Sequence, residues 1–202
     1  MTSPTATREF TFSERDFRRV CTLIYDRAGI ALADSKRDMV YSRLSRRLRT
    51  LGISGFQEYL DRLERDGGDE WEAFTNALTT NLTSFFRESH HFEILLGHLQ
   101  THRDQAPLRI WCAAASTGEE PWSLAITACE AFGSLAPPVS IIATDIDTQV
   151  LATGERGVYP LERIKTLSDE RKRRFFQRGS GPHEGMCRVN PALRKLATEQ
   201  AK

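Results

Sequence analysis

One stretch, residues 108–147, constrains the fold of this chain more than any other. Two short apolar runs, residues 108–114 and 139–143, flank a segment with helical composition. A tight turn with Gly118 and Pro121 joins the first run to that segment. Glycine accepts backbone angles that other residues resist, and proline fits the first helical turn. Strand, turn, helix and strand make a βαβ unit, so the sequence predicts an α/β fold with a parallel sheet.

Acidic residues near the carboxyl ends of the two strands indicate which ligand such a unit can hold. Asp145 ends the second run, where an acidic side chain takes the ribose hydroxyls of a bound nucleoside. The turn lacks the G-x-G-x-x-G pattern and carries Glu119 and Glu120. Their carboxylates repel a pyrophosphate but suit S-adenosylmethionine, whose sulfonium and ammonium groups are positive. An alternative stays open: both glutamates favour a helix N-terminus through its dipole, and Asp145 caps the next helix.

The composition is that of an ordinary globular protein. The 202 residues suffice for one large domain or two small ones, and the formal net charge of +1 gives no indication of nucleic-acid binding. No apolar run reaches membrane-spanning length, and the N-terminus lacks the features of a signal peptide. We therefore expect a cytoplasmic protein without membrane insertion. The four cysteines lack metal-type spacing, so no metal site is expected.

Four helices are expected before the βαβ unit. Ser13 is the predicted N-cap of the first helix, and Gly29 ends it. The second helix covers residues 36–51, the third includes residues 56–63, and the fourth begins at Trp71. The apolar residues that define them are Phe17, Val20, Cys21, Ile24 and Tyr25 in the first helix, Val40, Leu44, Leu48 and Leu51 in the second, and Trp71, Phe74, Leu78 and Leu82 in the fourth.

The second of these helices is strongly basic. It carries Lys36, Arg37, Arg43, Arg46, Arg47 and Arg49 against one acidic residue, Asp38. At about 100° per residue, Lys36, Arg43 and Arg47 fall on one flank of the helix. Such a ridge suits an acidic partner helix or a nucleic-acid backbone, although a charge run is commonly a solvated face. The nearly neutral net charge of the chain makes nucleic-acid binding the less favoured of these functions.

The segment between the helices and the βαβ unit, residues 81–88, alternates polar and aromatic side chains. Thr83 or Ser84 is expected to cap a helix over residues 91–102. A capped and packed linker explains this segment except for Asn81 and Arg87.

Further elements are expected after the βαβ unit. They are helices over residues 148–156 and 161–177, a turn-rich segment over residues 179–185, a short strand over residues 186–189 and a polar last segment.

Four segments carry a resemblance to a known family. They are NALTTNLTSFFRE, RIWCAAASTGEEPWSLAI, ATDIDTQVLATGERGVYP and FFQRGSGPHEGMCRV. They resemble the chemotaxis receptor methyltransferases, called CheR, and the similarity extends from Phe10 to Arg194. It implies transfer of the methyl group of S-adenosylmethionine to glutamate side chains on the cytoplasmic helices of methyl-accepting chemotaxis receptors. The other product is S-adenosylhomocysteine, and no metal takes part.

The resemblance also implies a domain organisation. Residues 10–88 are expected to form an all-helical domain that recognises the receptor. Residues 89–202 are expected to form part of a class I, Rossmann-like methyltransferase domain. A small β-subdomain, at about residues 175–195 by the resemblance, can dock on a C-terminal peptide of the receptor.

The resemblance assigns roles to single residues. The family's cofactor contacts fall on Asn81, Thr83, Arg87, Glu120 and Asp145, which leaves Glu119 as a helix-start residue. Arg87 is the expected catalytic residue, because a guanidinium can orient the incoming carboxylate by a charge-assisted pair. The basic helix matches the receptor-facing helix of the family, so the residues expected to bind the receptor are Lys36, Arg43, Arg46, Arg47 and Arg49.

The chemistry and the extent of the chain bear on activity. A glutamate is ionised at neutral pH, so its attack on a sulfonium methyl group requires alignment and exclusion of water rather than a strong base. The residues after Pro107 hold only the first of the two βαβαβ halves of a doubly wound domain. We therefore expect the N-terminal part of such an enzyme, truncated at its C-terminus. The alternative is a non-catalytic homologue that binds receptors as a module.

Overall fold

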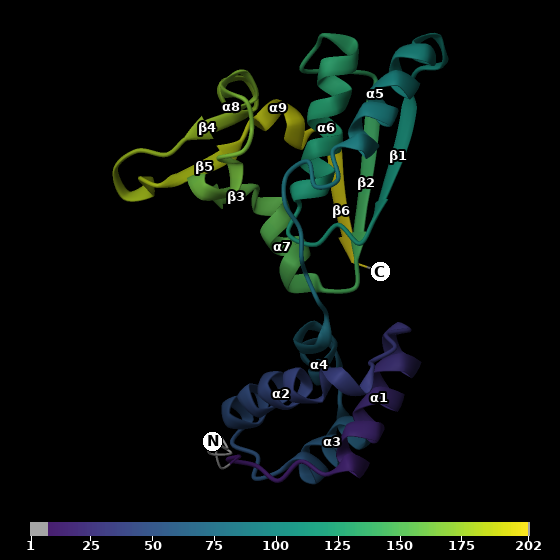
Figure 1. Ribbon diagram of the computed structural model, residues 1–202, viewed down its shortest axis with the longest axis vertical. Coiled ribbons are helices and arrows are strands. Elements are labelled where there is room, and N and C mark those ends of the chain that lie inside the picture. Colours follow the sequence, from purple (N-terminus) through teal and green to yellow (C-terminus); the bar gives the residue numbers. More distant parts are fainter. Residues whose placement is uncertain (1–7, 202) are drawn as a thin grey trace, which may run out of the picture. The chain divides into compact units, whose positions relative to one another are not determined.

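The computed structural model describes residues 8–201, which divide into two units, one up to Thr80 and one from Asn81 onward (Figure 1). The division differs from the expected boundary after residue 88. Phe85 packs edge to face against Tyr159 and Phe176, and the ring of Phe86 packs against Phe92. Residues 81–88 therefore belong with the second unit.

The first unit is helical, and its four predicted helices are confirmed. They are α1 (Glu14–Ala28), α2 (Arg37–Leu51), α3 (Phe56–Asp66) and α4 (Glu70–Leu78), with a short 3₁₀ turn, η1 (Asp34–Lys36), before α2. Ser13 caps α1 as predicted, in a capping box with Asp16, and Gly29 ends it with a φ of 67°. Gly52 ends α2 in the same left-handed conformation.

Two residues assigned to the apolar faces of these helices lie outside the core. Tyr25 is 60% exposed, because the buried stripe of α1 is narrow and follows Phe17, Val20 and Ile24. Leu82 is 74% exposed, because α4 ends at Leu78.

The second unit contains the predicted βαβ arrangement. Its first elements are α5 (His90–Thr101), η2 (Arg103–Gln105), β1 (Leu108–Ala113), α6 (Glu119–Phe132), β2 (Val139–Asp145) and α7 (Thr148–Arg156). The later ones are β3 (Val158–Pro160), η3 (Leu161–Ile164), α8 (Asp169–Phe175), β4 (Phe176–Arg178), η4 (Gly181–His183), β5 (Met186–Val189), α9 (Pro191–Arg194) and β6 (Ala197–Ala201).

The main sheet has the order β1-β2-β6, and both pairings are parallel. Figure 1 shows β2 between its two neighbours. Buried residues of α6, among them Trp122, Ile126 and Cys129, share one apolar core with Val139 and Ile141 of β2. The helix therefore covers one face of the sheet and leaves the β1–α6 turn at the carboxyl ends of the strands.

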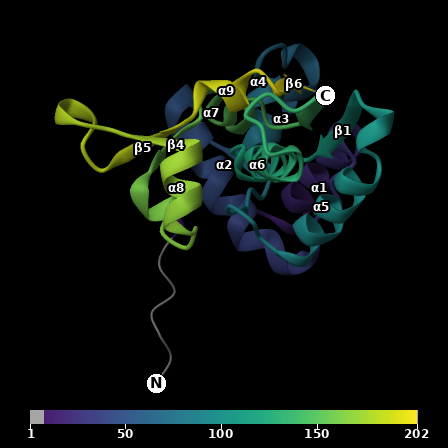
Figure 2. The same cartoon turned by 90° about the horizontal axis from the view of Figure 1, so that it is seen from above.

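A second, antiparallel sheet has the order β3-β5-β4. Its hairpin of β4 and β5 projects away from the main sheet (Figure 2). The strand expected over residues 186–189 is confirmed as β5. The sheet also takes in β3, so it begins earlier in the chain than residue 175.

One expectation for the C-terminal third is wrong. The helix expected over residues 161–177 is divided into η3, α8 and β4, because Ser168 accepts a hydrogen bond from the Arg171 N–H and starts a new helix. The polar last segment contains α9 and β6. Strand β6 forms by main-chain pairing with β2, and its sequence has no apolar run that would predict a strand. None of the described helices combines the length and apolarity needed to cross a membrane.

Candidate functional site

The turn between β1 and α6 has an unusual backbone. Ala114, Ser116 and Gly118 have φ angles of 70°, 51° and 92°. Left-handed conformations in residues other than glycine cost about 1–2 kcal/mol each and cluster at functional sites. The N–H groups of Ala114 and Ala115 both donate to the carbonyl of Thr144, at 2.8 and 2.9 Å. The turn is thereby fixed to the carboxyl end of β2.

Asp145 joins this turn to the one that follows β2. The residue is 7% exposed, and its carboxylate accepts the N–H of Ser116 at 2.8 Å and the N–H of Asp147 at 2.9 Å. The alternative role as a helix cap is wrong, because Asp147 caps α7 by accepting from Gln149 and Val150. Each Asp145 oxygen keeps a further lone pair for another hydrogen-bond donor.

The two glutamates of the turn have different surroundings. Glu119 is fully buried, forms an ion pair with Arg163 and accepts the hydroxyl hydrogen bond of Thr117 at 2.6 Å. Glu120 is exposed, and its carboxylate accepts a hydrogen bond from the Cys112 thiol at 3.5 Å. Glu119 is therefore more than a helix-start residue, whereas Glu120 can meet a ligand.

Gly118 has no room for a side chain. A Cβ atom there would lie 2.6 Å from the Gly154 Cα atom and 2.8 Å from the Tyr159 hydroxyl oxygen. The same hydroxyl donates to the Thr117 carbonyl at 2.7 Å. Helix α7 and strand β3 therefore pack directly against the turn and hold its shape.

Residues 81–89 are tied to the same region of the second unit. The Asn81 amide donates to the Asp147 carboxylate at 2.8 Å, beside the end of β2. The Phe86 N–H donates to the Ser123 hydroxyl of α6 at 3.0 Å, and Ser123 is fully buried. The segment is thereby attached both to the turn after β2 and to the first part of α6.

Arg171 and Glu130 hold Phe86, the residue before Arg87, through contacts that the sequence did not indicate. The Arg171 guanidinium carbon lies 3.9 Å from the centroid of the Phe86 ring. Two nitrogens of Arg171 also donate to the Glu130 carboxylate, at 2.7 and 2.8 Å. These residues come from α8 and α6, so no local pattern could have linked them to Phe86.

The predicted cofactor residues are brought together only in part. Hydrogen bonds connect Asn81, Asp145 and the turn of Glu120 through Asp147 and Ser116. Arg87 is exposed, donates to the Leu82 carbonyl at 3.3 Å and lies 3.8 Å from Glu88. Thr83 is half-buried on the same segment.

Comparison with known proteins identifies the family. Residues 81–198 match the model described as the SAM binding domain of CheR methyltransferase, and residues 15–79 match its all-alpha domain. The chain belongs to the CheR methyltransferase family. This confirms the resemblance and the expected order of a helical domain followed by an α/β domain.

Individual relatives agree with the CheR models. The chain is 54% identical to the chemotaxis protein methyltransferase of Salmonella typhimurium over 188 residues, 93% of this chain and 65% of that protein. It is 54% identical to chemotaxis protein methyltransferase 2 of Pseudomonas aeruginosa, over 94% of this chain and 68% of the relative. The Escherichia coli relative is 50% identical over 93% of this chain and 65% of its own length. The chain thus spans about two thirds of the length of these relatives.

In this CheR-family chain, two residues of the basic ridge, Arg43 and Arg47, already bond to α4. Arg47 donates to Glu70 of α4 through two nitrogens, at 2.7 and 2.5 Å, and this hydrogen bonding raises the pKa of Arg47. Burial, followed by the charge of Glu70, raises the pKa of Tyr59, whose hydroxyl donates to Glu70 at 2.8 Å. Arg43 donates to the carbonyls of Ala77 and Thr79 at the end of α4.

Acidic residues outside α2 therefore balance several of its basic residues, Arg47 among them. Arg37 pairs with Glu14, and Arg49 pairs with Glu9. Among the described residues, Lys36 and Arg46 form no ion pair. Receptor binding by the ridge stays a prediction.

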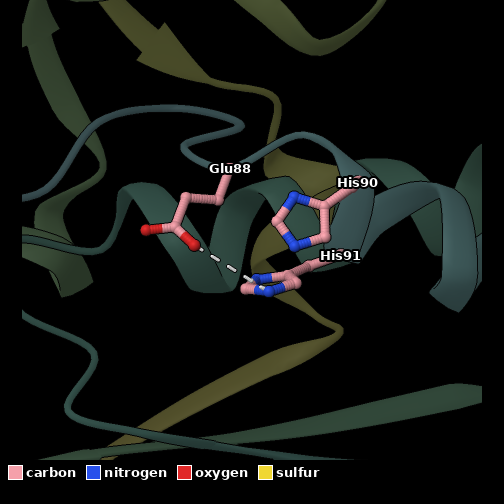
Figure 3. A group of neighbouring side chains, drawn as sticks. All are labelled: Glu88, His90 and His91. Carbon is pink, nitrogen blue, oxygen red and sulfur yellow. Dashed lines mark ion pairs between the residues drawn. The ribbon is translucent and has the colours of Figure 1, made fainter.

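One group of potential metal ligands was missed. Glu88, His90 and His91 each offer a ligand atom, and these atoms lie within 4.8 Å of one another (Figure 3). Cysteine spacing gives no indication of this group; its sequence signal is a His-His pair that begins two residues after a glutamate.

Proposed function

We propose that this chain binds S-adenosylmethionine and transfers its methyl group to glutamate side chains of methyl-accepting chemotaxis receptors in the cytoplasm. The proposal rests chiefly on the carboxylate of Asp145, which joins the turns after β1 and β2 and keeps lone pairs for a ribose. Membership of the CheR family and the names of its relatives support it.

The cofactor pocket follows from these contacts. Asp145 accepts the ribose hydroxyls, and the exposed Glu120 meets the positive part of the ligand. Asn81 holds the Asp147 carboxylate and thereby fixes residues 81–89 beside the turn. Gly118 keeps the turn free of a side chain that would displace α7. The residues present therefore fit a nucleoside with a cationic tail.

Arg87 is the residue proposed to orient the substrate. When bound, S-adenosylmethionine supplies an electrophilic methyl group on a sulfonium, so an ionised carboxylate becomes a methyl ester without a proton transfer. The two contacts of Arg87 are long, at 3.3 Å to Leu82 and 3.8 Å to Glu88. Its guanidinium can exchange them for a substrate carboxylate, which two parallel hydrogen bonds would align.

Two surfaces are proposed to meet the receptor. Lys36, directly before α2, and Arg46 on α2 offer positive charge to an acidic receptor helix. In the second unit, the β3-β5-β4 sheet bears a depression of about 340 Å³, lined in part by Val158, His183 and Met186. An extended C-terminal peptide of the receptor suits this depression, because a sheet can bind a peptide through its backbone and pockets for its side chains.

Calorimetry with S-adenosylmethionine tests the cofactor site most directly. We expect Glu120→Gln to weaken binding about tenfold, about 1.4 kcal/mol. Glu170→Gln is the matched control, since Glu170 is an exposed glutamate of the same unit on α8. Equal affinity of both variants and the unchanged chain would contradict the assignment of Glu120.

A transfer assay separates the two functional readings. Labelled S-adenosylmethionine and receptor-containing membranes should yield base-labile methyl esters on receptor glutamates, and Arg87→Ala should lose most of that label. Receptor binding without cofactor binding or label would instead support the non-catalytic module.

A further inference from the structure

Three metal-ligating side chains converge where residues 81–89 enter α5. The Glu88 carboxylate points toward the ring of His91, and the His90 ring lies beside that ring (Figure 3). One carboxylate oxygen of Glu88 is 3.9 Å from the Nε2 atom of His91, and the two imidazole centroids are 4.0 Å apart. We propose that Glu88, His90 and His91 bind a divalent transition-metal ion such as Zn²⁺.

The donor set fits such an ion. Imidazole nitrogens suit zinc, copper, nickel and iron, whereas calcium and magnesium take oxygen ligands almost exclusively. Two imidazoles and one carboxylate fill three positions and leave the remainder to water. All three side chains are exposed, so an ion can reach them from solvent without opening the fold.

The backbone already places the three ligands on one side. Glu88 has a φ of 54°, and its carbonyl accepts the N–H of His91 at 3.1 Å. This hydrogen bond closes a turn that brings a residue three positions earlier beside His91. The ordering cost of bringing Glu88 close to the histidines is therefore largely met before an ion binds.

Closing the site requires only side-chain rotation. Zinc bonds of about 2.0–2.1 Å in a tetrahedral site place ligand atoms about 3.4 Å apart. The present spacing is at most 4.8 Å, and exposed side chains reorient readily. The backbone of α5 can therefore stay where it is.

Some of the surrounding charges weaken the binding of a cation and others strengthen it. The N-terminus of α5 carries a partial positive charge, and Arg87 lies 3.8 Å from Glu88, so both disfavour a cation. The Glu88 carboxylate compensates, because it contributes a negative charge to the ion itself. These opposing effects favour moderate affinity, in the micromolar range, over a permanently occupied structural site.

The other end of the same helix supplies an internal control. His98 is also exposed and His102 is half-buried, and their rings stack with centroids 4.1 Å apart. The Nδ1–H of His102 donates to the His98 carbonyl at 2.8 Å, so this pair offers one ligand atom per ring and no carboxylate. A three-ligand site should therefore bind more tightly than this pair.

The test is zinc titration of the whole 202-residue chain, with any affinity tag removed, by calorimetry and by competition with a chromogenic chelator. We expect one ion per chain. His91→Ala should weaken binding at least about tenfold, about 1.4 kcal/mol, and Glu88→Gln should weaken it measurably. The double variant His98→Ala/His102→Ala should bind within about twofold of the unchanged chain.

Cobalt provides a second readout. The visible absorption of bound Co²⁺ reports coordination by nitrogen and oxygen ligands, and His91→Ala should abolish it while circular dichroism shows an unchanged fold. The proposal is overturned if no saturable micromolar binding occurs. It is equally overturned if His98→Ala/His102→Ala removes the binding and His91→Ala does not.

Discussion

The acidic turn before α6 and the basic face of α2 both carry several like charges, but the two regions pair and bury them differently. In each region a set of like charges is evident in the sequence, and the fold divides that set. Glu119 is buried and pairs with Arg163, whereas Glu120 is exposed. In α2, Arg47 pairs with Glu70, whereas Arg46 forms no ion pair among the described residues. Exposure and tertiary partners, rather than charge density, decide which residues remain for a ligand.

The two regions also differ in how well they tolerate substitutions. The turn is enclosed by α7 and β3 and contains left-handed residues, so a change of one atom disturbs several elements. At the border of α2 with α4, Arg47 forms an ion pair with Glu70 and Arg43 donates to the Ala77 carbonyl, and these long side chains can rearrange. We therefore expect large effects in the turn and small ones on α2.

The largest expected effect comes from Gly118→Ala. A methyl group there would approach Gly154 to 2.6 Å and would force alanine to a φ of 92°. We expect a loss of about 3 kcal/mol in stability, measured as faster hydrogen exchange in peptides from β1 and α6. Gly133→Ala is the control, because its φ is 65° but no atom lies within 4 Å. It should cost about 1 kcal/mol, and equal costs would show that close packing at the turn is unimportant.

The second effect separates the two glutamates. Glu119→Gln removes the charge that pairs with Arg163 and leaves a fully buried amide, so we expect a loss of about 2–3 kcal/mol. Arg163 is 41% exposed, which limits the loss. Glu120→Gln should change stability by less than about 0.5 kcal/mol while it weakens cofactor binding. Urea unfolding of the second unit, followed by hydrogen exchange, measures the stability of both variants. A larger loss of stability for Glu120→Gln than for Glu119→Gln would exchange the roles of the two glutamates.

Local signals account for what the sequence predicted correctly. Ser13, Gly29 and Gly52 mark helix ends through their own backbone chemistry, and the apolar runs of β1 and β2 frame α6. These signals act over a few residues, so they can be recognised without knowledge of the fold. They gave the four helices and the βαβ unit.

Long-range contacts account for what the sequence did not predict. Strand β6 is defined by main-chain pairing with β2, and Arg171 reaches Phe86 across most of the second unit's sequence. Among the cofactor residues, the resemblance selected Glu120 over Glu119, in agreement with their exposure. It could not show that Asp145 already accepts two backbone hydrogen bonds. Asp145→Asn would therefore disturb the turns as well as the ribose contact.

A third, smaller effect concerns the ion pair at the border of α2. Arg47→Gln breaks the paired hydrogen bonds to Glu70 and should cost about 1 kcal/mol, because both side chains are partly exposed. Arg46→Gln is the matched control and should change stability by less than about 0.5 kcal/mol. Thermal unfolding with hydrogen exchange in α2 and α4 measures both. Similar values for the two variants would show that Arg47 is a surface charge like Arg46.

The smallest expected effect tests receptor binding by Lys36 and Arg46, two basic residues that form no ion pair among the described residues. Reversing Arg43 or Arg47 would also disturb α4, so a loss of binding would be ambiguous. Lys36→Glu combined with Arg46→Glu avoids this problem. We expect about three- to tenfold weaker binding to receptor membranes, and a weaker dependence of binding on salt than in the unchanged chain. Arg62→Glu is the control, an exposed arginine on α3 of the same unit. If all three proteins bind equally at low salt, this face of α2 is solvated and the receptor lies elsewhere.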